Sequence, residues 1–215
     1  LLFTFLLIAM KILAIGKNYA EHIEEMKSEF DKFSGEPVVF SKPDTALLRQ
    51  NAPFYYPDFS QDIHHEVEII LKISKEGKNI EEQFAHKYYE EIGIGIDFTA
   101  RDVQAKLKKN SYPWDIAKGF NGSAPVSEFV PKERYPDLQA LNFHLEVNGE
   151  QRQKGNTSMM IFNFHYIIAY LSKYFTLKKG DIIFTGTPSG VGPVQIGDRL
   201  CAFIEGEKML DFEIK

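Results

Sequence analysis

Cysteine and long apolar runs are scarce in this 215-residue sequence, and their scarcity excludes several classes of protein. The single cysteine, Cys201, cannot form an intramolecular disulfide, so we expect a reducing, cytoplasmic setting. A membrane-spanning helix needs about 20 apolar residues, and the apolar stretch LLFTFLLIAM at residues 1–10 is too short. Basic residues are not in excess either, because the formal net charge of −5 disfavours nucleic acid and anionic membranes as partners.

A nucleotide-binding motif is also missing. The glycine-rich segment TGTPSGVGP (185–193) is neither a GxGxxG loop after a first strand nor a Walker loop. Its backbone N–H groups could bind an anion, and a plain cluster of turns explains the same composition equally well.

The apolar residues 1–9 stand apart from the rest of the chain. They lack the basic region and the small-residue cleavage site of a signal peptide. Because Met10 immediately precedes the strand-like KILAIG, we expect Met10 to be the biological start, with 1–9 an upstream extension. A genuine N-terminal strand or a dimer contact is the alternative. The expected organisation is therefore one catalytic domain over 10–215, preceded by this extension.

Short strand patterns outnumber helical ones in the sequence. With 44% hydrophobic and 26% charged residues, the chain has the composition of a globular protein. Strands and helices do not alternate regularly, which predicts a β-rich α+β fold rather than a doubly wound sheet. The expected strands are 11–16, 37–43, 62–74, 90–98 and 180–186, with hairpins at 140–155 and 199–215; the expected helices are 19–30, 99–109 (with Thr99 and Asp102 as a capping box) and 158–175.

Two glutamates share one face of the strand expected at 62–74. Glu66 and Glu68 are two positions apart, which places their Cα atoms about 6.5–7 Å apart on that face. Two carboxylates at this spacing can converge on a hard divalent cation such as Mg²⁺. On spacing alone, a solvated outer face is the better interpretation. Asp97, at the end of the next strand, could supply a third carboxylate or could simply mark the entry to a helix.

Two further positions carry possible catalytic groups. His22 and Glu25 are three residues apart in the expected helix 19–30, so the carboxylate could orient the imidazole as a general base. A surface His–Glu pair explains the same spacing. Lys118, in the loop-rich segment 110–130, could bind a substrate carboxylate, although most lysines are simply solvated.

Taken together, seven stretches of the chain resemble the fumarylacetoacetate hydrolase family, and most closely its short acylpyruvase and oxaloacetate decarboxylase members. They occur in the family's order from about residue 11 to the C-terminus: GKNYAEHIEEM, EPVVFSKP, IHHEVEI, GIDFTARDVQ, PWDIAKGFNGSAPVS, VNGEQRQKGNTSMMIF and KKGDIIFTGTPSGVGPV. The resemblance implies a mixed β-sandwich roll with flanking helices, usually a homodimer. The N-terminal SH3-like domain of the full-length hydrolase has no counterpart here, which counts against fumarylacetoacetate as substrate.

The resemblance also implies a role for each site residue. Glu66, Glu68 and Asp97 are expected to bind Mg²⁺ or Mn²⁺, and His22 with Glu25 to activate water. Lys118 is expected to complete the catalytic set. The expected substrate contacts are Arg101, Gln104, Thr187, Lys17 and Lys42.

The implied reaction is cleavage of the carbon–carbon bond of an acylpyruvate through a metal-stabilised pyruvate enolate, with decarboxylation of oxaloacetate through the same enolate. The His22/Glu25 pair favours hydrolysis, because hydrolysis needs an activated water. The alternatives are a 2-hydroxyhepta-2,4-diene-1,7-dioate isomerase, an oxaloacetate keto–enol tautomerase, or a metal-stabilised dimer without catalysis. The expected partner in each enzymatic case is a small 2-keto acid.

Overall fold

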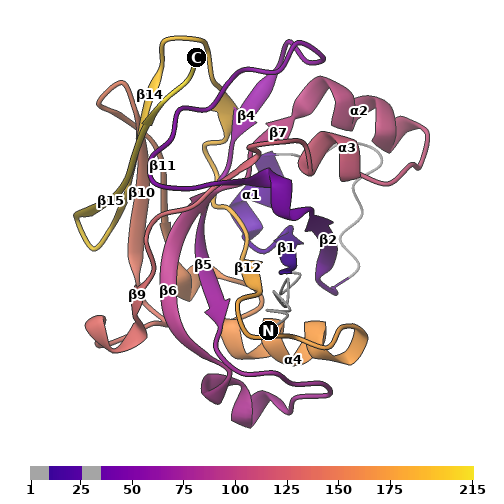
Figure 1. The fold of residues 1–215 in the computed structure, drawn as a ribbon, viewed down its shortest axis with the longest axis vertical. Helices are drawn as coiled ribbons and strands as arrows, with labels where there is room; N and C mark the ends of the chain where they lie inside the picture. Colours follow the sequence, from indigo (N-terminus) through magenta and orange to yellow (C-terminus); the bar gives the residue numbers. More distant parts are fainter. Residues whose placement is uncertain (1–9, 26–34) are drawn as a thin grey trace, which may run out of the picture.

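The computed structural model describes residues 10–25 and 35–215, and a six-stranded sheet lies at its centre (Figure 1). Within this sheet of the described chain, β1 and β12 pair in parallel and the other neighbours are antiparallel. The strand order is β2 (Val38–Lys42), β1 (Ile12–Gly16), β12 (Ile182–Phe184), β5 (Val67–Ile73), β6 (Tyr89–Ile96) and β9 (Val130–Pro131). Strands from both ends of the chain therefore meet in the middle of this sheet.

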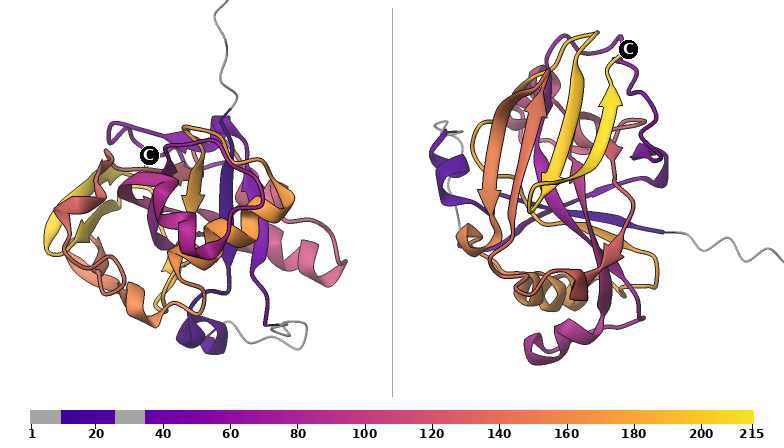
Figure 2. Two further views of the ribbon diagram at one scale, coloured as in Figure 1. Left: turned by 90° about the horizontal axis from the view of Figure 1, so that it is seen from below. Right: turned by 90° about the vertical axis from the view of Figure 1, so that its left-hand side faces the viewer.

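A second, four-stranded antiparallel sheet packs beside the first and faces the viewer in the right-hand view of Figure 2. Its order is β11 (Glu150–Asn156), β10 (Asn142–Val147), β14 (Arg199–Ile204) and β15 (Glu207–Glu213). Both predicted hairpins are confirmed. Asn148 and Gly149, with φ of 54° and 79°, form a two-residue turn in which both residues are left-handed, as a type I′ turn requires.

Both faces of the six-stranded sheet are buried. Along β5, Val67, Ile69 and Leu71 point into the main core, which they share with the four-stranded sheet. Ile70 points the other way, into a smaller apolar cluster that includes Phe184 and side chains from outside the sheet. Glu68 and Ile70, on this second face, are therefore buried, although strand alternation alone suggested that they would face solvent.

Shorter elements close the ends of the two sheets. The strands are β4 (Ile63–His65), β7 (Thr99–Ala100) and β13 (Gly192–Pro193) in one group, and β3 (Leu47–Leu48) with β8 (Ala124–Pro125) in another. The helices are α1 (Ala20–Glu25), α2 (Arg101–Lys109), α3 (Asp115–Lys118) and α4 (Phe164–Tyr174), with 3-10 turns η1 (Asp44–Ala46), η2 (Glu82–Lys87), η3 (Lys132–Arg134) and η4 (Thr157–Met159). None of the helices in the described ranges is long and apolar enough to cross a membrane.

The β-rich α+β prediction is confirmed, with three local corrections. The strand expected at 62–74 is two strands, β4 and β5, separated at Glu66. The helix expected at 158–175 begins only at Phe164, where the Asn163 side chain accepts the first-turn N–H of Tyr166. Lys118 ends the four-residue helix α3 rather than lying in a loop. Of the helix expected at 19–30, α1 forms the first part, and residues 26–30 lie outside the described ranges.

The capping box predicted from Thr99 and Asp102 is wrong. Thr99 belongs to β7, and α2 begins after it without a side-chain cap. The Thr99 hydroxyl accepts a hydrogen bond from Lys118 Nζ at 2.6 Å, so it is engaged elsewhere. The Asp102 carboxylate accepts from Ser60 Oγ and from the N–H of Gln61 instead, which anchors α2 to the segment before β4.

Candidate metal and active site

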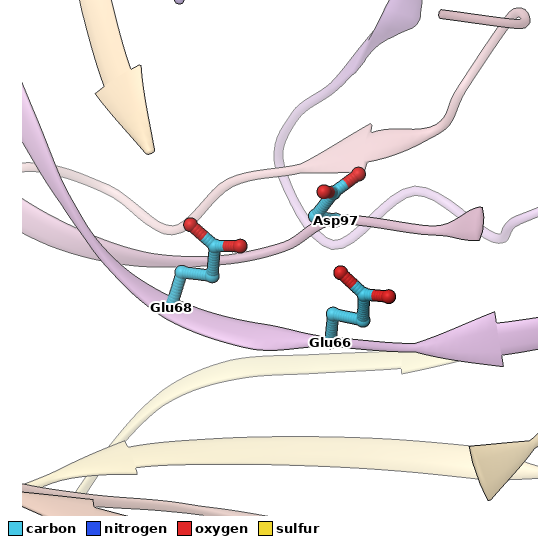
Figure 3. Close-up of side chains that lie close together, drawn as sticks. All are labelled: Glu66, Glu68 and Asp97. Carbon is cyan, nitrogen blue, oxygen red and sulfur yellow. The ribbon is translucent and has the colours of Figure 1, made fainter. Parts of the chain in front are cut away.

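Three buried carboxylates converge where β5 begins and β6 ends. Glu66 lies in the gap between β4 and β5, Glu68 lies in β5, and Asp97 directly follows β6. The N–H of Asp97 donates to the carbonyl of Glu66 at 2.8 Å, which holds the two strand ends together. One oxygen from each carboxylate lies within 4.8 Å of the others, and the three residues are 5%, 2% and 1% exposed (Figure 3). The solvated-face interpretation of the glutamates is therefore wrong.

Lys118 bridges two of these carboxylates. Its Nζ donates to Glu66 Oε2 and to Asp97 Oδ2, both at 2.7 Å, and to the Thr99 hydroxyl. The other oxygen of Glu66 accepts from Arg101 at 2.6 Å. Charge-assisted bonds of this kind fix the orientation of the carboxylates that make them. The two cations thus hold Glu66 and Asp97 in place.

Lys42 lies behind Asp97 and does not line the pocket described below. Its Nζ is 2.7 Å from Asp97 Oδ1 and also donates to the carbonyls of Lys118 and Ser123. Because these partners enclose the ammonium group, Lys42 supports Asp97 from within the protein. The substrate contact expected for Lys42 does not follow from this position.

Among the described residues, the hydrogen bond that holds Glu68 comes from the backbone of the glycine-rich segment. The N–H of Gly186 donates to Glu68 Oε2 at 2.6 Å. Gly186 has a φ of +106°, and a Cβ there would lie 2.6 Å from the Cβ of Asn18, so only glycine fits. Asn18 in turn donates to the carbonyls of Phe162 and Thr185, which fixes the approach to Gly186. This amide therefore binds an anion within the protein.

The buried charges shift one another's protonation. Burial, reinforced by Asp97, holds the pKa of Glu68 well above its usual range, against the opposing N–H of Gly186. Burial lowers the pKa of Lys42, although Asp97 opposes the change. Burial also acts to lower the pKa of Lys118, but Asp97 and Glu66 prevail and raise it, so Lys118 is held as a cation. Without a further cation, the site therefore favours a proton on Glu68.

The donor set fits a hard divalent ion. Carboxylate oxygens are the ligands that Mg²⁺ and Mn²⁺ prefer, and three of them lie close enough to share one ion. Asp97 Oδ1 is buried and contacts the Lys42 ammonium group at 2.7 Å. An ion that binds here would share the carboxylates with the neighbouring cations and would replace a proton on Glu68.

A pocket with about 570 Å³ of empty space, part of it open to solvent, lies over the three carboxylates. Apolar walls come from Ile15, Phe40 and Trp114. Besides the three carboxylates, the other lining side chains are polar or basic, and they include five further predicted site residues: Lys17, Arg101, Gln104, Lys118 and Thr187. Basic groups over a carboxylate floor suit a small anionic ligand that also contacts a cation.

The predicted His22–Glu25 pair stays a prediction. Both residues belong to α1, but their side chains lie outside the described part of the chain. The neighbouring Glu21 is described, and its carboxylate accepts a hydrogen bond from Ser189 Oγ at 3.2 Å. Helix α1 therefore contacts the same glycine-rich segment that holds Glu68.

Sequence reasoning missed two polar residues that shape the site. Asn18 and Gln153 are buried, and each bonds to segments far away in the chain. For Gln153 the signal was a polar residue at an inward-facing position of an alternating strand, Leu145 being its cross-strand partner. Asn18 had no comparable signal, because it lies in a loop.

The chain matches the family model described as fumarylacetoacetate (FAA) hydrolase C-terminal over residues 11–214. It is 47% identical to the mitochondrial oxaloacetate tautomerase FAHD1 of Mus musculus over 204 residues, 95% of this chain and 91% of that protein. It is 44% identical to the oxaloacetate tautomerase YcgM of Escherichia coli, covering 93% of this chain and 90% of the relative.

Among solved structures, it superposes with a TM-score of 0.88 on a fumarylpyruvate hydrolase from Pseudomonas aeruginosa in complex with Mn²⁺ and pyruvate. The identity is 31%, covering 96% of this chain and 89% of that one. The resemblance seen in the sequence is confirmed: the chain belongs to the fumarylacetoacetate hydrolase family.

Proposed function

We propose that this protein is a Mg²⁺- or Mn²⁺-dependent enzyme that interconverts the keto and enol forms of oxaloacetate. The observation that carries the proposal is the convergence of Glu66, Glu68 and Asp97, with Lys118, under a basic pocket. The choice among the family's reactions is supported by relatives 44–47% identical over nearly the whole chain that are named oxaloacetate tautomerases.

The formal charges of the site support a dicarboxylate substrate. With Glu68 ionised, as a bound ion would require, Lys42, Lys118 and Arg101 balance Glu66, Glu68 and Asp97, so these six groups together are formally neutral. A divalent ion brings a formal charge of plus two, equal and opposite to that of a fully ionised 2-keto dicarboxylate. Lys17 and Lys108 add positive charge to the pocket wall and would favour entry of such an anion.

The described residues bind and orient, and the proton transfer falls to another group. A bound divalent ion would supply Lewis-acid polarisation of the 2-keto group. Lys118 is held protonated by two carboxylates, so it stabilises negative charge and is a poor base. Thr187 and Arg101 line the pocket, where they can donate to substrate oxygens.

We assign the proton transfer to His22, with Glu25 as its orienting partner. In the forward reaction the base takes a proton from carbon 3 of the keto form, and a proton reaches the oxygen on carbon 2 to give the enol. A histidine suits this task because its usual pKa lies near neutrality.

The test follows the loss of enol absorbance in freshly dissolved oxaloacetate. We expect Mg²⁺ to accelerate the conversion and a chelator to remove the acceleration. His22→Ala should lose about 10²–10⁴-fold in rate with unchanged Mg²⁺ binding, and the neighbouring Glu24→Ala, exposed on α1, is the matched control. Enzyme that converts oxaloacetate equally fast in chelator would refute the metal role, and enzyme that does not accelerate it at all would refute the tautomerase.

Hydrolysis of acylpyruvates is the second candidate, favoured by the fold shared with a fumarylpyruvate hydrolase. The predicted water-activating pair would serve it directly. Release of pyruvate from acetylpyruvate, coupled to lactate dehydrogenase, separates this reaction from tautomerisation. The homodimer and the cytoplasmic location stay predictions.

A further inference from the structure

Gln153 connects both sheets to the candidate site from the inner face of β11. It is 1% exposed, and its amide bonds to β4, to β5 and to the glycine-rich segment. Oε1 accepts from the N–H of Val67 at 3.0 Å and lies 2.9 Å from His65 Nδ1. Nε2 donates to Thr187 Oγ1 at 2.8 Å and to the Pro188 carbonyl at 3.0 Å. All four hydrogen-bonding positions of the amide are therefore used.

The partners fix which end of the amide is oxygen. The N–H of Val67 can only donate, and the carbonyl of Pro188 can only accept. A flipped amide would place its NH₂ group against the Val67 N–H and its oxygen against the Pro188 carbonyl, so neither hydrogen bond could form. It follows that His65 carries a hydrogen on Nδ1, since it must donate to Oε1. This requirement comes from the hydrogen-bond geometry alone.

The same orientation fixes the polarity of the Thr187 hydroxyl. Because Nε2 of Gln153 donates to Thr187 Oγ1, the hydroxyl hydrogen points away from Gln153. Thr187 lines the pocket together with Glu66, Glu68 and Asp97. A hydroxyl with one oxygen lone pair already occupied is a ready donor, which suits a carboxylate or enolate oxygen and disfavours an N–H group.

We infer that Gln153 is a positioning residue that sets the Thr187 hydroxyl as a hydrogen-bond donor to the anionic substrate. The inference rests on the proposed function only for the identity of that anion. Gln153 also accepts from the backbone N–H of Val67, the residue between Glu66 and Glu68, so one side chain contacts both the donor and the strand that carries the two glutamates.

The test separates the accepting half of the amide from its donating half. Gln153→Glu keeps an acceptor for Val67 and His65 but cannot donate to Thr187. Thr187→Val removes the hydroxyl and keeps the side-chain shape. Gln151→Glu is the matched control, because it makes the same charge change at an exposed position of the same strand.

The readout is binding of pyruvate to the Mg²⁺-loaded protein by titration calorimetry. We expect Gln153→Glu and Thr187→Val each to weaken pyruvate roughly tenfold to hundredfold, the size of one hydrogen bond to a charged oxygen. The double variant should bind no worse than Thr187→Val, and Mg²⁺ affinity should be nearly unchanged throughout. If the two losses in pyruvate affinity multiply in the double variant, as plain charge repulsion would give, the inference is overturned. A parallel loss of Mg²⁺ binding overturns it as well.

A second measurement needs neither metal nor substrate. Long-range ¹⁵N–¹H correlation spectra of the wild-type protein should show a hydrogen on Nδ1 of His65. A ring without a hydrogen on Nδ1 overturns the amide orientation, and with it the role of Gln153, whatever the enzyme's reaction. If His65 carries a hydrogen on Nδ1 but the protein does not bind pyruvate, the proposed function is refuted and the hydrogen-bond assignment is still supported.

Discussion

Asp97 and Asp211 make nearly the same contacts in opposite surroundings. Each carboxylate is paired with two cations at 2.6–2.7 Å: Asp97 with Lys118 and Lys42, and Asp211 with Arg199 and Lys208. Asp97 is buried with its partners, whereas the side chains of Arg199 and Lys208 are about half exposed. The first group, with Glu66 and Arg101, is called the buried cluster below; Asp211, Arg199 and Lys208 form the surface cluster.

The difference lies in what each arrangement costs the folded state. Removing charges from water costs several kcal/mol per ion, and the attraction between them offsets this only when every partner is present. Exposed pairs lose little on folding and gain little. A buried cluster with this cost is therefore better explained by function than by stability, which agrees with its place under the pocket.

The largest expected effect is the loss of one buried cation. Lys118→Met leaves Glu66 and Asp97 close together without the ammonium that links them, and we expect a loss of about 3–5 kcal/mol in the free energy of unfolding. Urea denaturation in chelator measures it. Lys208→Met is the matched change in the surface cluster, and an equal loss there would contradict the comparison.

The second largest effect is stabilisation by Mg²⁺, which should depend on the buried cluster and not on the surface cluster. At a Mg²⁺ concentration about a hundredfold above its dissociation constant, the wild-type protein should gain about 2.7 kcal/mol. Asp97→Asn should remove this gain, and Asp211→Asn should keep it. Thermal melts with Mg²⁺ and with chelator provide the measurement; a full Mg²⁺ response in Asp97→Asn would exclude it as a ligand.

The two clusters should respond to pH with opposite signs. The pKa of Glu68, beside the buried cluster, is raised by burial and by Asp97. In metal-free protein, the contribution of Glu68 to the free energy of unfolding is therefore favourable below about pH 4.5 and is lost as pH rises. The Arg199 and Lys208 hydrogen bonds lower the pKa of Asp211, so its contribution is present above about 3.8 and is lost in stronger acid.

Denaturation across pH checks both signs in chelator. Relative to wild type, Glu68→Gln should gain stability as pH rises above about 4.5. The deficit of Asp211→Asn should disappear as pH falls well below 3.8. Parallel pH profiles for the two variants would contradict the opposite signs.

The smallest effect belongs to the surface cluster. Lys208→Met should lower the melting temperature by less than about 2 °C. The difference should vanish in about 1 M NaCl, where the Debye length is about 3 Å. Calorimetry at low and high salt measures it, and a difference that survives high salt would point to packing rather than charge.

Local signals in the sequence predicted the hairpins and identified the three carboxylates that converge in the structure. The Asn148–Gly149 turn needs two left-handed residues, which those residue types favour. Glu66, Glu68 and Asp97 were identifiable because strand alternation and strand ends are local features, and the family resemblance joined them. Their burial was not predictable, since it depends on segments that cover the second face of the sheet.

Lys42 and Gln153 show why the rest of the site could not be predicted from the sequence. Lys42 was expected in the pocket, but its partners Asp97 and Ser123 are brought behind it by tertiary packing. Gln153 bonds to residues 34 and 88 positions away along the chain. No local pattern encodes contacts of that range.

The place of β12 has a consequence for the order of folding. This strand, Ile182–Phe184, inserts between β1 and β5, and the next segment supplies the Gly186 N–H that holds Glu68. On the ribosome, the first two-thirds of the chain therefore emerges with a gap in its central sheet and with edges able to pair wrongly. The carboxylate site is completed only when β12 and Gly186, in the last sixth of the chain, have been made, so this long-range topology predicts slow folding.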